Sequence, residues 1–162
     1  MSSSIYNKFD SIEEFEKKIR AEKKYSKKHS ILIIDEEAAI HKYLRKLFSL
    51  WGFEVISALN SIDGLEMAIE RKPDLIILDF GMPTLKGDTM LKIFKRLTVT
   101  KNIPVIIISA NLDKNILANA YKAGAIRFIT KPFTQKILLK NLKESLNPDI
   151  VKEMKLSVLT PE

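Results

Sequence analysis

Two short apolar runs constrain the fold of this chain more than any other feature. They are residues 75–78 (Leu-Ile-Ile-Leu) and residues 105–108 (Val-Ile-Ile-Ile), and a proline stands shortly before each of them. An unbroken run of this kind is typical of a strand covered on both faces, as in a parallel sheet flanked by helices. Because both runs fall far short of the roughly 18 residues that a membrane span requires, we expect no membrane insertion.

Amphipathic segments alternate with such strands from residue 30 onward, in the pattern of consecutive βα units. We predict strands at residues 31–35, 54–57, 74–79, 105–108 and 126–130. We predict a first helix that ends before Gly52, followed by helices at residues 61–71, 88–97, 113–123 and 134–146. The predicted fold is therefore α/β, a doubly wound five-stranded parallel sheet with helices on both faces.

This domain is predicted to occupy residues 30–147, with a further segment on either side. Residues 1–29 contain a capping box at 11–14 and only a narrow apolar stripe, which indicates one short helix in an N-terminal extension. The pair Asn147-Pro148 is interpreted as the end of the last helix, so residues 148–162 are expected to form a C-terminal tail or linker.

Composition and charge exclude several classes of site. The chain has 162 residues and no cysteine, which excludes disulfides, a thiolate nucleophile and Cys-ligated zinc. The N-terminus lacks the apolar segment of a signal peptide, so we expect a cytoplasmic location. The net charge is +7, but the largest basic clusters, residues 23–24 and 27–28, lie among glutamates. We interpret them as solvated helix surface and expect no direct nucleic-acid binding by this chain alone.

Side chains that can bind ligands or take part in a reaction lie at the carboxyl ends of the predicted strands. In a parallel sheet these ends meet at one edge, where open α/β sheets bind ligands. The residues there are Asp35 with Glu36 and Glu37, then Asp79, Ser109 and Lys131.

Clustered carboxylates at this edge favour a bound cation. Two like charges about 4 Å apart repel by roughly 4 kcal/mol at an effective dielectric near 20, so Asp35, Glu36 and Asp79 need a positive charge between them. Oxygen ligands without histidine or cysteine favour Mg²⁺. A carboxylate beside such an ion, with a lysine and a hydroxyl nearby, can attack a phosphoryl group. Each residue alone also has a structural interpretation, such as Asp35 capping a helix, so the hypothesis rests on the four strand ends together.

Four motifs give the chain a recognisable pattern: residues 33–37 (Ile-Ile-Asp-Glu-Glu), 78–83 (Leu-Asp-Phe-Gly-Met-Pro), 108–110 (Ile-Ser-Ala) and 128–133 (Phe-Ile-Thr-Lys-Pro-Phe). In these motifs, their order and their spacing, the chain resembles the CheY-like receiver domain of two-component response regulators. The resemblance covers about residues 30–146. It implies a flavodoxin-like sheet with strand order 2-1-3-4-5.

The resemblance also implies a role for each residue at the sheet edge. Asp79 would be the phosphoacceptor. Mg²⁺ would be held by the side chains of Glu36 and Asp79 and by the Gly81 carbonyl, with Asp35 bound through water. Glu36 stands where an aspartate is more frequent, and its longer side chain still reaches a metal.

Three further residues follow from the same resemblance. Ser109 would hydrogen-bond the phosphoryl group, and Lys131, followed by a cis peptide to Pro132, would pair with it. Ser109 and Phe128 would form the switch that reports phosphorylation. The family tunes phosphoryl hydrolysis at the positions of Gly81 and Asn111, so the lifetime of the phosphoryl group is left open.

By the same resemblance, the expected function is that of a signalling phosphoprotein rather than a turnover enzyme. A sensor histidine kinase or a histidine phosphotransfer protein would donate the phosphoryl group to Asp79 with Mg²⁺ as cofactor. A face formed by residues 113–146 would then bind a downstream protein or a second copy of the chain. The residues expected on this face are Leu117, Tyr121, Lys122, Lys136 and Lys140.

Other functions have less support. A flavin mononucleotide site would place a phosphate where three carboxylates follow the first strand, and a haloacid-dehalogenase phosphatase needs an aspartate where Gly81 stands. No Gly-rich nucleotide loop is present. The receiver half of a larger transcription factor or output enzyme remains open as an alternative. A receiver used only as a scaffold is disfavoured, because the acceptor, the acidic pair, the hydroxyl and the lysine are all present. His29 and His41 are too isolated to form a metal site, and His41 is expected on the surface.

Overall fold

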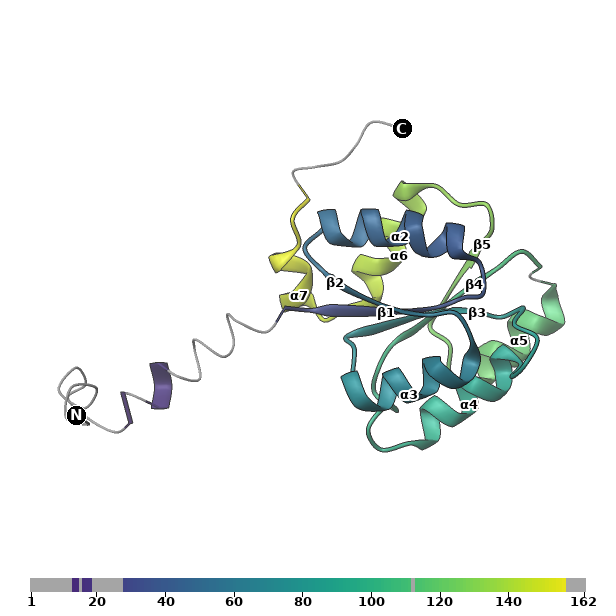
Figure 1. The fold of residues 1–162 in the computed structure, drawn as a ribbon, viewed down its shortest axis with the longest axis horizontal. Coiled ribbons are helices and arrows are strands. Elements are labelled where there is room, and N and C mark those ends of the chain that lie inside the picture. Colours follow the sequence, from purple (N-terminus) through teal and green to yellow (C-terminus); the bar gives the residue numbers. More distant parts are fainter. Residues whose placement is uncertain (1–12, 15, 19–27, 112, 157–162) are drawn as a thin grey trace.

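The computed structural model describes residues 13–14, 16–18, 28–111 and 113–156, and residues 28–156 within these ranges form an α/β domain (Figure 1). The N-terminal extension predicted for residues 1–29 lies mostly outside the described residues, although residues 13–14 and 16–18 are helical. None of the helices in the described ranges is long and apolar enough to cross a membrane.

Five parallel strands form the sheet in the order β2-β1-β3-β4-β5, which confirms the predicted topology. The strands are β1 (Ser30–Ile34), β2 (Glu54–Ala58), β3 (Leu75–Asp79), β4 (Val105–Ser109) and β5 (Arg127–Thr130). The two apolar runs of the sequence lie in β3 and β4, where every residue is buried. Both strands lie inside the sheet rather than at its edges, and helices cover both of their faces, so apolar residues are buried on either side.

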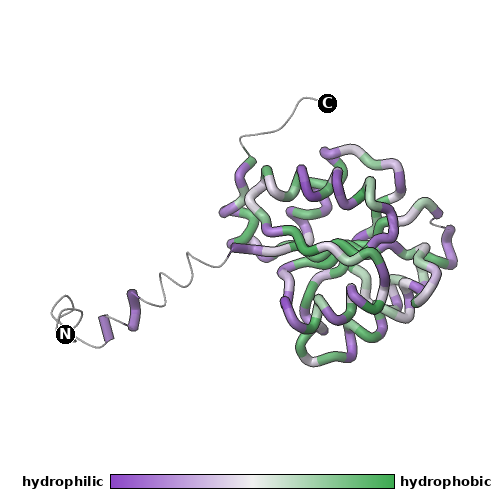
Figure 2. Tube along the Cα trace, viewed as in Figure 1, coloured by the Kyte–Doolittle hydropathy of each residue, from purple (hydrophilic) through white to green (hydrophobic). Residues whose placement is uncertain are grey.

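Successive residues of the central strands face opposite sides of the sheet. Ile31 and Ile33 belong to one apolar cluster, and Leu32 and Ile34 belong to the other. This alternation is the two-residue period of a strand. Figure 2 shows the hydrophobic residues gathered in the strands, with hydrophilic residues along the outer sides of the helices.

Helices pack on both faces of the sheet, with α2, α6 and α7 on one side and α3, α4 and α5 on the other (Figure 1). Most of their bounds lie within a residue or two of the prediction, in part because side chains cap the N-termini: Asn60 for α3, Asp113 for α5 and Thr134 for α6. The helices are α2 (Ala38–Leu50), α3 (Ser61–Arg71), α4 (Gly87–Arg96), α5 (Lys114–Ala123), α6 (Gln135–Ser145) and α7 (Pro148–Glu153).

The short helix α7 was not expected from the sequence. Asn147 accepts a hydrogen bond from the Asp149 amide and so caps the helix, while Pro148 stands in its first turn. Ile150, Val151 and Met154 are partly buried against the cluster beneath α2 and α6. Residues 148–156 therefore pack on the same core as the domain predicted for residues 30–147.

Gly64 marks the closest approach between α3 and the sheet. A Cβ at Gly64 would lie 2.7 Å from Ile34 Cδ1 and 2.8 Å from Ile34 Cγ2, and Ile34 is fully buried. We expect Gly64→Ala to lower the free energy of unfolding by about 1–3 kcal/mol, because overpacking strains a close-packed core. Denaturant unfolding measures the loss, with Glu66→Ala on the exposed side of α3 as a control within about 0.5 kcal/mol of wild type. An unchanged Gly64→Ala protein would contradict this packing.

Candidate phosphoryl and metal site

The two central aspartates reach the same edge because their strands are neighbours. Asp79 ends β3, and Asp35 follows β1, which pairs with β3 in parallel register. Both are buried, with 2% of Asp35 and 8% of Asp79 exposed. Asp35 Oδ1 accepts the Glu37 amide at 2.8 Å, and Asp79 Oδ1 accepts the Gly81 amide at 3.0 Å. The turns after the strands therefore fix the direction of both carboxylates.

Lys131, which follows β5, brings its ammonium to this pair of carboxylates. Its Nζ lies 2.9 Å from Asp35 Oδ2, 2.9 Å from Glu37 Oε1 and 3.9 Å from Asp79 Oδ2. The peptide bond between Lys131 and Pro132 is cis, as the family resemblance implied. The predicted convergence of the ends of β1, β3 and β5 is thus present.

Charge is unevenly balanced within the cluster. Burial raises the pKa of Asp79, and repulsion from Asp35 adds to the rise, although the Gly81 amide and Lys131 oppose it. Burial alone would lower the pKa of Lys131, but its hydrogen bonds to Glu37 and Asp35 outweigh burial and leave that pKa raised. The single ammonium of Lys131 is shared among three carboxylates, so it does not fully neutralise the negative charge of ionised Asp79.

The structure gathers a different glutamate from the one that sequence reasoning chose. The carboxylate oxygens that lie within 4.8 Å of one another belong to Asp35, Glu37 and Asp79. Glu36 is exposed and is not part of this group. The role of Glu36 as a metal ligand stays a prediction, as does that of the Gly81 carbonyl.

Oxygen donors of this kind fit a hard divalent cation. Asp35, Glu37 and Asp79 each offer one carboxylate oxygen, and none of the histidines that the structure describes joins them. Mg²⁺ is commonly held by one or two carboxylates with water and substrate oxygens in its remaining positions. The raised pKa of Asp79 is the mark of a carboxylate that a further positive charge would stabilise.

The hydroxyl of Ser109 is turned into the loop after β4. Its Oγ donates to the Asn111 carbonyl at 3.0 Å and accepts from the Asn111 amide at 3.2 Å. Phe128 on β5 is partly buried and meets the Tyr121 ring edge-on, with centroids 4.5 Å apart. Both residues expected to act as a switch thus have specific local partners.

His41 was expected on the surface, and that expectation was wrong. Only 6% of it is exposed, and its Nε2 donates to the Asp35 carbonyl at 2.7 Å. Its place on the inner side of α2, three residues before Leu44, was the available signal, because i and i+3 positions share a helix face. His41 therefore supports the turn that carries Asp35.

Comparison with known proteins identifies relatives along most of the domain. The family model of the response regulator receiver domain matches residues 31–143. The chain is 34% identical over 120 residues to the chemotaxis protein CheY of Bacillus subtilis, covering 74% of this chain and 98% of CheY. It is 33% identical over 117 residues to the phosphate regulon transcriptional regulatory protein PhoB of Pseudomonas aeruginosa, covering 72% of this chain.

The chain spans about half the length of several curated relatives, namely 51% of PhoB and 50% of the transcriptional regulatory protein KdpE of Mycobacterium tuberculosis. Among solved structures, the receiver domain of the sensor histidine kinase PA1611 from Pseudomonas aeruginosa matches with a TM-score of 0.67. It is 20% identical, and the match covers 74% of this chain and 98% of that one. That structure is described with a magnesium ion in its active-site cleft. At this identity the likeness concerns the fold alone.

Proposed function

Because the chain belongs to the response regulator receiver domain family, we propose that it is a phosphoacceptor switch in which Asp79 takes a phosphoryl group from a phosphohistidine. One observation carries the proposal: Asp79 is buried at the end of a central strand, within reach of Lys131 and two further carboxylate residues. The donor class, a sensor histidine kinase or a histidine phosphotransfer protein, follows from family membership.

In this proposal the residues of the cluster divide the tasks of attack, charge stabilisation and metal binding. Asp79 Oδ1 accepts the Gly81 amide, so Oδ2 is assigned as the nucleophile that forms the new P–O bond while the bond from phosphorus to the donor nitrogen breaks. The Lys131 ammonium, 3.9 Å from Oδ2, stabilises negative charge on the transferred phosphoryl oxygens. Asp35, Asp79 and either Glu36 or Glu37 would hold Mg²⁺, which supplies charge neutralisation when bound. The protein is changed by the reaction and is not a turnover enzyme.

Phosphorylation by a small acyl phosphate tests this assignment. Wild-type protein incubated with acetyl phosphate and Mg²⁺ is expected to gain one phosphoryl group by intact-mass spectrometry. EDTA should abolish the gain, because the carboxylate cluster would then lack a divalent cation. Asp79→Asn should show no gain even with Mg²⁺. A phosphorylated Asp79→Asn protein would overturn the assignment of the acceptor.

We further propose that phosphorylation of Asp79 changes the surface formed by α5, β5 and α6. A groove of about 420 Å³ lies between these elements, and Tyr121, Phe128 and Lys140 are among the residues that line it. A phosphoryl group on Asp79 adds strong acceptor oxygens that compete for the Ser109 hydroxyl, which now bonds Asn111. Loss of that loop contact would free the start of α5 and shift the Tyr121–Phe128 pair. The groove would then bind a downstream protein or a second copy of the chain.

Amide chemical shifts test this route. Beryllofluoride, which imitates a phosphoryl group on Asp79, is expected to shift resonances of residues 113–140 as well as those of the site. Ser109→Ala should confine most shifts to the residues around Asp79, since it removes the hydroxyl that links the site to the loop. Shifts confined to the site in wild-type protein would refute the route.

The relatives leave a larger regulator as the second candidate, since PhoB is about twice as long as the matched segment. In such a protein the same groove would contact an attached output domain. The match to CheY covers 98% of that protein, which gives equal support to a protein that consists of a receiver domain alone. The chain length of the natural gene product distinguishes the two.

A further inference from the structure

The positive charge of the domain lies mainly in its second half, which includes the helices α4 and α5. Residues 86–124 hold seven lysines and arginines against two aspartates, whereas residues 31–85 hold five basic residues against nine acidic ones. Residues 86–124 include α4 and α5, which lie side by side on the same face of the sheet (Figure 1). Residues 86–124 thus contribute a net charge of +5, and residues 125–147, with five basic residues against one glutamate, contribute a further +4. The helices α4 and α5 therefore carry part of a positive charge that is spread over the second half of the domain.

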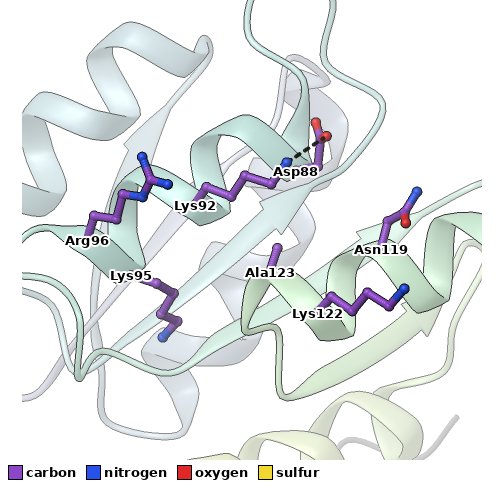
Figure 3. A pocket seen from close by; sticks show the side chains of 7 residues that line it. All are labelled: Asp88, Lys92, Lys95, Arg96, Asn119, Lys122 and Ala123. Atoms are coloured by element: carbon purple, nitrogen blue, oxygen red, sulfur yellow. Dashed lines mark ion pairs between the residues drawn. The ribbon is translucent and has the colours of Figure 1, made fainter.

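A hollow of about 520 Å³ lies between α4 and α5. This size falls within the range of about 300–1,000 Å³ that is usual for small-molecule sites. Figure 3 shows that its lining side chains come from both helices. They are Asp88, Lys92, Lys95 and Arg96 from α4, and Asn119, Lys122 and Ala123 from α5.

The cations that line this hollow have few protein acceptors. Lys92 pairs with Asp88 at 3.8 Å, which is a long contact between exposed groups. Within the part of the chain that the structure describes, Arg96 and Lys122 have no carboxylate partner. Donor groups from two helices thus face the hollow without acceptors of their own.

Lys95 adds a fixed positive charge beside the hollow. Its ammonium donates to the Ile103 carbonyl at 2.8 Å and to the Lys101 carbonyl at 3.3 Å, and it points away from Arg96 (Figure 3). Its stem lies against Gly124, where a Cβ would be 2.9 Å from Lys95 Cγ. Burial lowers the pKa of Lys95, which indicates that no nearby carboxylate compensates its charge.

We propose that this hollow binds a small anion that carries two or more linked phosphate groups, such as inorganic triphosphate or a nucleoside triphosphate. Four cations and one aspartate line the site, which suits a ligand with several negative charges. The guanidinium of Arg96 is a planar donor fork that matches phosphate oxygens. Among the described residues that line the hollow, none is aromatic and Ala123 is the one apolar residue. It therefore offers neither a base-stacking platform nor an apolar anchor for a protein.

Titration with inorganic triphosphate in Mg²⁺-free buffer tests the proposal. Binding is expected to saturate below about 1 mM, with amide shifts centred on residues 88–96 and 119–124. The Arg96→Gln, Lys122→Gln double variant should raise Kd at least about tenfold, because it removes two charged contacts. Asp88→Asn should lower Kd by about two- to threefold, since it removes the one opposing charge.

The matched control is Lys42→Gln with Lys46→Gln, which removes the same charge from α2 on the opposite face of the sheet. This control should leave Kd within about twofold of wild type. If both double variants weakened triphosphate binding equally, the attraction would come from the overall charge of the protein, and the proposed site would be wrong.

Titration with adenosine triphosphate shows which part of the ligand is recognised. A Kd equal to that of inorganic triphosphate means that the phosphate chain alone is recognised, and a lower Kd means that the nucleoside adds contacts. A duplex oligonucleotide that binds these residues more tightly than either would overturn the proposal in favour of nucleic acid.

Discussion

Lys131→Gln is expected to destabilise the metal-free protein more than any other single charge removal in the domain. Asp35, Glu37 and Asp79 would then share a site without their cation. Removing one partner from a buried ion pair costs about 3–5 kcal/mol. Because 55% of the Glu37 side chain is exposed, we expect a smaller loss of about 2–3 kcal/mol in the free energy of unfolding. Denaturant unfolding in EDTA measures it.

Two comparisons separate this effect from a general loss of charge. Lys140→Gln, on the exposed side of α6, should stay within about 0.5 kcal/mol of wild type. Millimolar Mg²⁺ should restore part of the stability of Lys131→Gln, because the ion supplies positive charge to the same carboxylates. A Lys131→Gln protein as stable as wild type in EDTA would contradict the contacts of Lys131 with Asp35, Glu37 and Asp79.

Asp79→Asn is expected to stabilise the metal-free protein at neutral pH. Burial and the charge of Asp35 raise the pKa of Asp79, so the folded state opposes its ionisation. Removing that ionisation should raise stability by about 1 kcal/mol, or roughly 3–5 °C in Tm for a domain of this size. The same variant should lose the stabilisation by Mg²⁺, which for wild type is about 2.7 kcal/mol at a concentration 100 times Kd.

The pH dependence of this gain has a fixed sign. A carboxyl group whose pKa is higher in the folded state contributes stability while it is protonated, and it loses that contribution as pH rises through the folded pKa. The advantage of Asp79→Asn should therefore be largest at neutral pH and should vanish as pH falls below the ordinary range of an aspartate. Thermal unfolding in EDTA across that range measures it. If the stability advantage of Asp79→Asn grew on acidification, the metal-free fold would favour the ionised form of Asp79, and the account would be wrong.

Most of the fold and the position of the site could be predicted from the sequence because both follow from local patterns. The apolar runs of β3 and β4 allow little other than buried parallel strands. Once the strands run parallel, Asp35, Asp79 and Lys131 must share an edge. Their contacts also depend on the strand order, which the family resemblance implied and local patterns alone did not give.

The features that sequence reasoning missed depend on the course of single turns. One such feature is the contact between Glu37 and Lys131, which the turn after β1 sets up, while Glu36 is exposed and its role as a metal ligand stays a prediction. Asn147-Pro148 was interpreted as the end of α6, but the same pair also begins α7, as a cap followed by a first-turn proline. Such choices depend on packing partners that a single sequence does not identify.

The most direct test of the account is to locate the phosphoryl group on the chain. Borohydride reduces an acyl phosphate, so that tandem mass spectrometry of the digested protein can identify the residue that carried it. After reaction with acetyl phosphate and Mg²⁺, the account predicts the modification at Asp79 and at no other residue of the cluster. Modification of Asp35, Glu36 or Glu37, or a stable ester on Ser109, would contradict it.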